Sequence, residues 1–257
     1  MRARRRRRTA TLLVAVAAIV SWSAPPAAAT AADYRLRYVT GPDGVTRLAR
    51  WNPCQTISFQ VNVSLAGDTR AARRSAASDV RTAVARLSRR TGISFRYTGR
   101  TTYLPNGSRY HPWWEDSPAE LVVAWVDQRD PAHRSNLLGR DSEGDWADGT
   151  GGFAFKSWNH GSGWQLAAGR GFVVINAADT WDLRPGFGRG LTRGELLLHE
   201  LGHVMGLAHV PTRSQTMYPV LLPRAAAGYH AGDRAGLLAV GRAAGCISVP
   251  HDVWPGI

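Results

Sequence analysis

Residues 199–209 read His-Glu-Leu-Gly-His-Val-Met-Gly-Leu-Ala-His, and this stretch is the most informative part of the chain. Thr192 and Glu195 stand three residues apart just before an apolar run, which is a capping-box pattern for the start of a helix. On that helix His199 and His203 are four residues apart, so both imidazoles lie on one face, within reach of a single zinc ion.

The residues around this histidine pair complete the pattern of a catalytic metal site. Gly206 follows three residues after His203, and glycine commonly ends a helix because it readily adopts positive φ. The chain is then expected to turn back and bring in His209 as a third ligand, which leaves one zinc position for water. Zinc lowers the pKa of that water, and Glu200 is placed to accept its proton and return it to a leaving amine.

The rest of the chain predicts one mixed α/β or α+β sheet domain. Alternating apolar and polar residues, or short apolar runs, predict strands at residues 57–63, 93–97, 120–127, 151–155 and 171–176. Residues 68–90 have one apolar face and predict a helix that ends at Gly92. The arginines on its other face are either a solvated surface or a contact for an acidic partner.

The motif at 199–209 resembles the extended zinc motif of the metzincin metalloproteases. Residues 214–219, SQTMYP, are similar to the matrixin form of the methionine turn that follows it, which places Met217 below the zinc ligands. The resemblance implies a twisted, mostly parallel sheet with an antiparallel edge strand and an active-site helix. It also implies a small C-terminal subdomain that holds the methionine turn and a final helix.

Two further site predictions come from this resemblance. Residues 151–155, GGFAF, resemble the matrixin edge strand, so Phe153, Ala154 and Phe155 are expected to pair antiparallel with an extended substrate. Matrixins also carry calcium in the loops before that strand. The acidic residues there, which offer hard oxygen ligands for Ca²⁺, are Asp141, Glu143, Asp145 and Asp148. Their spacing is not that of an EF-hand, so a solvated acidic loop is the alternative.

The first 31 residues have the three-part pattern of a secretory signal peptide. Arginines at positions 2 and 4–8 precede an apolar core at 11–20 and a small-residue segment with a cleavage site after Ala29 or Ala31. An uncleaved membrane anchor is the alternative, although ten apolar residues are short for one. The expected organisation is a signal at 1–31, a short segment at 32–50 and a catalytic domain at 51–257, in a secreted protein.

The net charge of +13 first suggests a nucleic-acid-binding protein. Six of these charges lie in the predicted signal peptide, which leaves +7 on the remaining chain. No basic motif outside the signal is interleaved with aromatic residues, so nucleic acid is not an expected partner. No apolar run reaches 18 residues, so no ordinary membrane-spanning helix is expected either.

Cys54 and Cys246 are the only two cysteines. An oxidising compartment favours a disulfide between them, and closing so long a loop stabilises by roughly 4–5 kcal/mol in the chain-entropy model. A free thiol or zinc ligand at Cys54 is the alternative.

The sequence as a whole predicts a secreted, monomeric zinc endopeptidase that hydrolyses protein or peptide substrates. The alternative is a catalytically silent secreted protein of the same fold that binds an anionic cell surface.

Overall fold

The computed structural model describes residues 33–108, 110–159, 161, 163–250 and 255–256. The predicted signal peptide lies outside the described residues. The elements are, in chain order, β1 (Arg35–Leu36), β2 (Tyr38–Thr40), β3 (Thr46–Leu48), β4 (Ile57–Asn62), α1 (Arg70–Thr91), β5 (Phe95–Arg100), β6 (Leu121–Val126), β7 (Gly149–Asn159), β8 (Trp164–Asn176), α2 (Arg193–Val204), β9 (Leu207–Ala208), α3 (Ala231–Val240), the 3₁₀ turn η2 (Arg242–Ala244) and β10 (Pro255–Gly256).

The main sheet has the order β10-β7-β8-β6-β4-β5. Strands β5, β4, β6 and β8 are parallel to one another, whereas β7 pairs antiparallel with β8. This arrangement confirms the predicted α+β fold with its antiparallel edge strand. The β7–β8 hairpin is longer than predicted, because its outer half carries polar residues and glycines that do not show the apolar pattern of a buried strand.

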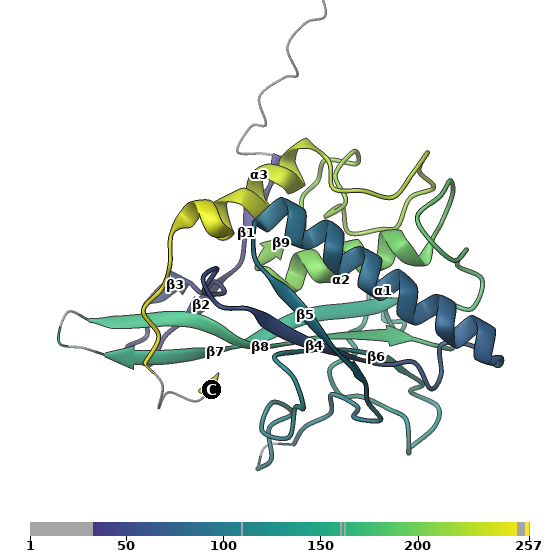
Figure 1. Cartoon of the computed structure of the whole chain (residues 1–257), viewed down its shortest axis with the longest axis horizontal. Coiled ribbons are helices and arrows are strands. Elements are labelled where there is room, and N and C mark those ends of the chain that lie inside the picture. Colours follow the sequence, from purple (N-terminus) through teal and green to yellow (C-terminus); the bar gives the residue numbers. More distant parts are fainter. Residues whose placement is uncertain (1–32, 109, 160, 162, 251–254, 257) are drawn as a thin grey trace, which may run out of the picture.

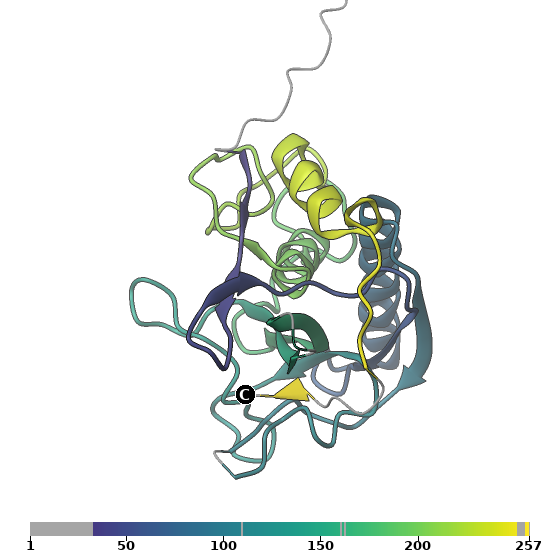
Figure 2. The ribbon, with the colours of Figure 1, turned by 90° about the vertical axis from the view of Figure 1, so that its left-hand side faces the viewer.

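Both long helices lie on one face of the sheet, with α2 over β7 and β8 and α1 beside it (Figures 1 and 2). The core on this side contains inward residues of β6 and β8 such as Val123, Trp125 and Ile175, packed against Leu197 and Leu201 of α2. The opposite face carries a smaller cluster around Trp113 and Phe172. The alternation of side chains along each strand supplies both layers.

The predicted helix at 68–90 is confirmed as α1, with Thr69 as its N-cap and Gly92 in the left-handed conformation at its end. A part-buried ion pair joins this helix to the start of α2, since Arg193 Nη2 lies 2.6 Å from Asp79 Oδ2. The same carboxylate accepts a hydrogen bond from the Gly186 N–H. This linkage fixes where α2 begins, and therefore where its histidines lie.

The N-terminal segment packs beside the end of α2. β1 pairs antiparallel with β9, with Arg35 opposite Ala208 and Leu36 opposite Leu207. The following residue, Arg37, donates its backbone N–H to the carbonyl oxygen of Gly206. Residues upstream of the strands of the main sheet thus reach the stretch that carries the third histidine.

Cys54 and Cys246 form a disulfide that closes a loop of 192 residues. We expect the double substitution Cys54→Ser with Cys246→Ser to lower the free energy of unfolding by roughly 4–5 kcal/mol, because the unfolded chain regains loop entropy. Chemical denaturation monitored by circular dichroism would measure this difference. An unchanged unfolding midpoint and slope would contradict it.

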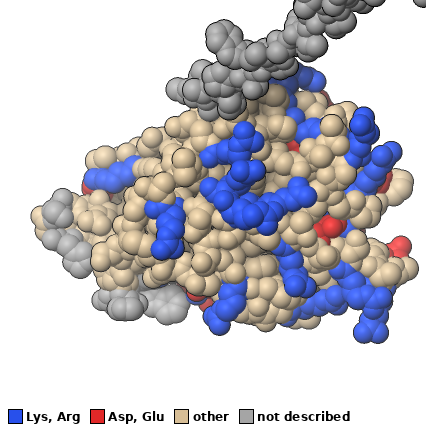
Figure 3. All heavy atoms as spheres, turned by 45° about the horizontal axis from the view of Figure 1, so that its top comes forward, with Lys and Arg blue, Asp and Glu red and all other residues tan. Residues whose placement is uncertain are grey.

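Exposed arginines gather on the helical side of the molecule (Figure 3). On α1 the exposed arginines are Arg70, Arg74, Arg81, Arg89 and Arg90, while the one acidic residue of that helix, Asp79, is buried in its ion pair. Within the described residues, no helix is both long and apolar enough to span a membrane.

Candidate metal centre and active-site cleft

The helix α2 carries the first two histidines of the predicted site. Thr192 is its N-cap, and the Thr192 hydroxyl accepts a hydrogen bond from the Glu195 N–H, as the capping-box pattern predicts. In a complete capping box the Glu195 carboxylate would accept a hydrogen bond from the Thr192 N–H. Here the carboxylate accepts a hydrogen bond from Arg224 Nε at 2.5 Å instead. The helix ends at Val204, and Gly206 takes a φ of 91° that lets the chain turn back into β9.

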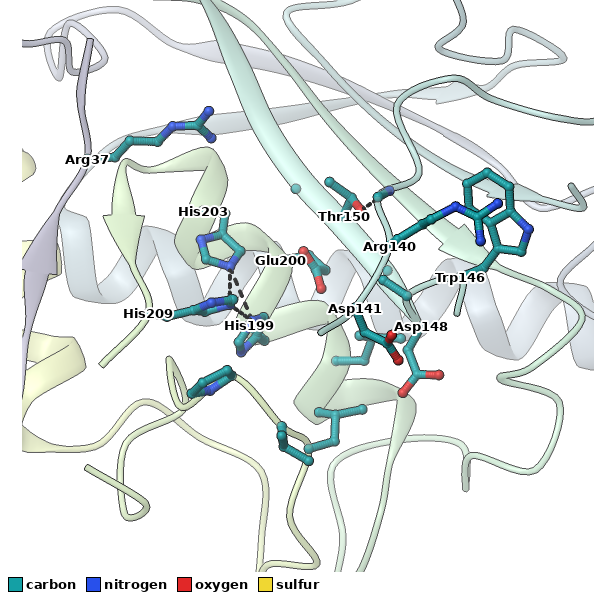
Figure 4. A pocket seen from close by; sticks show the side chains of 18 residues that line it. Arg37, Arg140, Asp141, Trp146, Asp148, Thr150, His199, Glu200, His203 and His209 are labelled. Carbon is teal, nitrogen blue, oxygen red and sulfur yellow. Dashed lines mark hydrogen bonds between the residues drawn. The ribbon is translucent and has the colours of Figure 1, made fainter. Parts of the chain in front are cut away.

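This turn brings three imidazoles together (Figure 4). The Nε2 atoms of His199, His203 and His209 are separated by 3.0, 3.1 and 3.2 Å. Four-coordinate zinc with Zn–N bonds near 2.0–2.1 Å requires N···N separations of about 3.3–3.4 Å. The three nitrogens therefore fit the triangular face of a tetrahedral zinc site to within a few tenths of an ångström.

The hydrogen bonds of the first two histidines fix which nitrogen faces the centre. His199 Nδ1 lies 2.8 Å from the carbonyl oxygen of Thr216, and His203 Nδ1 lies 2.8 Å from that of Leu207. Carbonyl oxygens only accept, so each Nδ1 is the protonated nitrogen and each Nε2 keeps its lone pair for a metal. Burial lowers the pKa of His199 to about 4 and that of His203 to about 3, which keeps both rings neutral near pH 7.

Glu200 lies beside the histidines, against the start of β7. It is buried, and a Cβ placed on Gly149 would approach its Cγ and Oε1 to 3.1 Å. Burial raises the pKa of Glu200 to about 8, and the negative charge of Asp148 adds to this, whereas a hydrogen bond from the Gly151 backbone opposes it. The carboxyl group is thus held close to the histidines, with one backbone donor to orient it.

Met217 packs directly beneath α2. It is 1% exposed, and a Cβ on Gly202 would overlap its sulfur atom. The absence of a side chain at Gly202 lets the methionine approach the helix between the two histidine turns. Met217 also accepts a hydrogen bond from the Val210 N–H through its carbonyl oxygen, which ties it to the segment after His209.

A fully buried carboxylate on α3 holds the methionine turn in place. Asp233 accepts hydrogen bonds from the backbone N–H groups of Thr216 at 2.7 Å, Met217 at 3.1 Å and His230 at 2.9 Å. The Thr216 carbonyl in turn accepts from His199. Asp233 is therefore a positioning residue for the first histidine, and its effect passes through the backbone of the turn.

The histidines and Glu200 line a cleft of about 460 Å³ that follows β7. β7 lines the cleft with Gly149, Thr150 and Gly151, and none of the predicted substrate-pairing residues Phe153, Ala154 and Phe155 is among the lining. Phe155 is paired on its outer side with Gly256 of β10. Among the described residues no strand pairs with the outer side of β7 over Gly149–Ala154, so the open edge is shifted towards Glu200 relative to the sequence prediction.

The predicted calcium ligands are partly brought together. Ligand atoms of Asp141, Glu143 and Asp145 lie within 4.8 Å of one another, and all three residues are exposed, whereas Asp148 is outside this group. The Asp141 carboxylate accepts from the backbone N–H groups of Glu143 and Asp145, so hydrogen bonds within the turn account for the grouping. Calcium at this loop stays a prediction.

The carboxylates near Asp148 form a larger acidic region. Partial desolvation raises the pKa of Asp148, and the negative charges of Asp179, Asp182 and Asp141 raise it further. Asp179 and Asp182 follow β8 and are distant in sequence from the acidic loop.

Several functional contacts have no clear sequence signal. The carbonyl oxygens of Thr216 and Leu207 that orient the histidines are backbone atoms of residues with no distinctive side chain. Gly151 and Gly202 are visible in the sequence, but only the tertiary structure shows that each faces a neighbouring element at close range. Asp233 has a detectable signal, since it is an acidic residue in the first turn of α3, where the helix dipole favours negative charge.

The fold and the three-histidine site together define a metzincin-type metalloprotease. Residues 138–239, from the loop before β7 through most of α3, match the family model described as Matrixin. Residues 138–239 therefore form a matrixin-like metzincin domain. No curated protein matches it.

Proposed function

We propose that this protein is a secreted zinc-dependent endopeptidase in which His199, His203 and His209 hold the metal and Glu200 is the general base and then the general acid. The convergence of the three Nε2 atoms, 3.0–3.2 Å apart beside a buried carboxyl group, carries the proposal. Zinc held there supplies positive charge that polarises a peptide carbonyl, activates a water molecule and favours the ionised form of Glu200.

The residues of the chain have distinct tasks in this reaction. The open edge of β7 binds an extended peptide by backbone hydrogen bonds, as the resemblance to matrixins implies. Glu200 takes a proton from the attacking water and passes it to the nitrogen of the scissile peptide bond, which leaves as an amine. The Gly151 N–H and the contact with Gly149 keep the carboxyl group aimed at the cleft.

Metal removal tests the zinc assignment. We expect a chelator to abolish cleavage of casein by the exported protein and stoichiometric Zn²⁺ to restore it, with one zinc per chain by elemental analysis. His203→Ala should lose most of the bound zinc, because two ligands hold the ion far less tightly than three. Full cleavage by a protein shown to be metal-free would refute the assignment.

A second function remains a candidate because of the arginines on α1 (Figure 3). A catalytically silent protein that binds an anionic cell surface would use this basic face. This second function predicts that the protein binds zinc but cleaves no member of a broad peptide library. It also predicts that an anionic polymer retains the protein, and that this retention weakens as the salt concentration is raised. Cleavage-site profiling by mass spectrometry of the zinc-loaded protein would separate the two functions.

A further inference from the structure

The two ends of the active-site cleft carry opposite charges. Figure 4 shows Arg37 at one end, Asp141 and Asp148 at the other, and Glu200 with the histidines between them. All of these side chains line the same cleft. The arrangement gives the cleft an electrostatic direction, which bears on the peptides that it is suited to bind.

Arg37 is brought to the cleft by the pairing of β1 with β9. Its backbone N–H donates to the carbonyl oxygen of Gly206 at 2.7 Å, and a Cβ on Gly152 would lie 3.8 Å from its Nη1 atom. The side chain is exposed, and its guanidinium forms no ion pair with any described residue. Its charge is therefore available to a ligand that lies along β7.

The opposite end is acidic in a chain that is basic overall. Six of the 19 acidic residues gather around it, from the loop before β7 and the segment after β8: Asp141, Glu143, Asp145, Asp148, Asp179 and Asp182. Arg140 lies beside the acidic loop, and its side chain is engaged locally. The Arg140 guanidinium stacks 4.0 Å over the Trp146 ring and donates to the carbonyl oxygen of Gly144.

The direction of β7 relates these charges to a bound peptide. Asp148 directly precedes β7, Gly149 and Gly151 contact Glu200, and Gly152 lies beside Arg37. A peptide that pairs antiparallel with this strand has its N-terminal part near Arg37 and its C-terminal part near the acidic residues. This step rests on the proposed function, because it takes the scissile bond to lie at Glu200.

We propose that the cleft selects peptides with an acidic residue on the N-terminal side of the scissile bond and a basic residue on its C-terminal side. Arg37 is the specificity-determining residue for the first position, and Asp141 and Asp148 are those for the second. Exposed charge pairs are individually weak, so the expected preference is about 3- to 10-fold from both ends together. It decreases as salt screens the charges.

Two quenched peptides of identical composition provide the test. Both have the same apolar centre. In the acid-first peptide an acidic residue precedes this centre and a basic residue follows it, and in the reverse peptide the two charged residues are exchanged. We expect the acid-first peptide to have about 3- to 10-fold higher kcat/KM at low ionic strength, and most of this difference to vanish in 0.5 M NaCl. Equal rates, or a preference for the reverse peptide, would overturn the proposal.

Matched variants assign the preference to its two ends. Arg37→Gln should remove the increase in kcat/KM that the acidic residue of the peptide gives. Asp141→Asn should reduce the increase that the basic residue gives, and it keeps the side-chain oxygen that accepts the hydrogen bonds within the loop. Arg70→Gln on α1 is the control and should behave as the wild type. An unchanged preference in Arg37→Gln would overturn the role of Arg37.

Binding measurements keep this test separate from the proposed function. Fluorescence anisotropy with zinc-loaded Glu200→Gln reports which of the two peptides binds more tightly without any cleavage. An uncharged peptide with the same centre reports proteolysis by the wild type. If the uncharged peptide is cut but the charged pair binds equally, the charge preference alone fails. If nothing is cut and the acid-first peptide still binds more tightly, the proteolytic function alone fails.

Discussion

Glu200→Gln is expected to lower kcat/KM for peptide cleavage by about 10³-fold while zinc stays bound. General acid–base catalysis by a positioned side chain contributes 10²- to 10⁴-fold, and glutamine cannot take up the proton of the attacking water. The substitution preserves size, and the glutamine oxygen is still able to accept the hydrogen bond from the Gly151 backbone. The measurement is steady-state cleavage of a quenched peptide, with the zinc content determined on the same sample.

The matched control is Glu115→Gln, an isosteric change at an exposed glutamate whose one ion pair, to His111, lies on the surface. It should leave both the cleavage rate and the zinc content unchanged. Cleavage by Glu200→Gln at the wild-type rate, with the metal in place, would show that another group moves the proton.

Gly151→Ala is expected to reduce both stability and activity. A Cβ at this position would lie 2.8 Å from the carbonyl carbon of Glu200 and closer still to its oxygen, so β7 and α2 must move apart. Overpacking of this kind typically costs about 1–3 kcal/mol of folding free energy. The movement also shifts the backbone donor of Glu200, and a displacement of about 1 Å at a reacting group costs up to about 10²-fold in rate.

Thermal unfolding and kcat/KM for the same quenched peptide measure the two effects. Gly188→Ala is the control, because a Cβ there meets no atom within 4 Å and its φ is not in the left-handed region. A Gly151→Ala protein with wild-type melting temperature and activity would contradict the close packing of β7 on α2.

The architecture was largely predictable because its elements depend on local patterns. The capping residue Thr192, the apolar run that follows it and the glycine at position 206 fixed the active-site helix and its end within the chain. The strand at 171–176 was found for the same reason, since its residues are apolar. The outer half of the β7–β8 hairpin was missed because it is stabilised by pairing between two polar segments, which leaves no apolar periodicity to detect.

The histidine spacing predicted the metal centre more completely than it predicted the cleft. A fixed spacing on a helix determines that His199 and His203 share a face, and Gly206 permits the return of His209. The free part of the edge strand was placed less well. Phe155 belongs to the same apolar pattern as Phe153, but β10 pairs with it from a distant part of the sequence, and no local pattern encodes that contact.

The sequence by itself determined the donor set of the metal centre, the helix that presents it and the order of the principal strands and helices from β4 to α2, because each of these follows from residue type and short spacing. Only the tertiary structure decided which carbonyl oxygens orient the histidines, how closely Gly151 and Gly202 approach their neighbours and which charges flank the cleft. Arg37 and Asp148 are more than 100 positions apart, and they line one cleft because β1 pairs with β9 while β7 packs on α2. Such long-range contacts arise from the packing of whole elements, whose geometry no short stretch of sequence specifies.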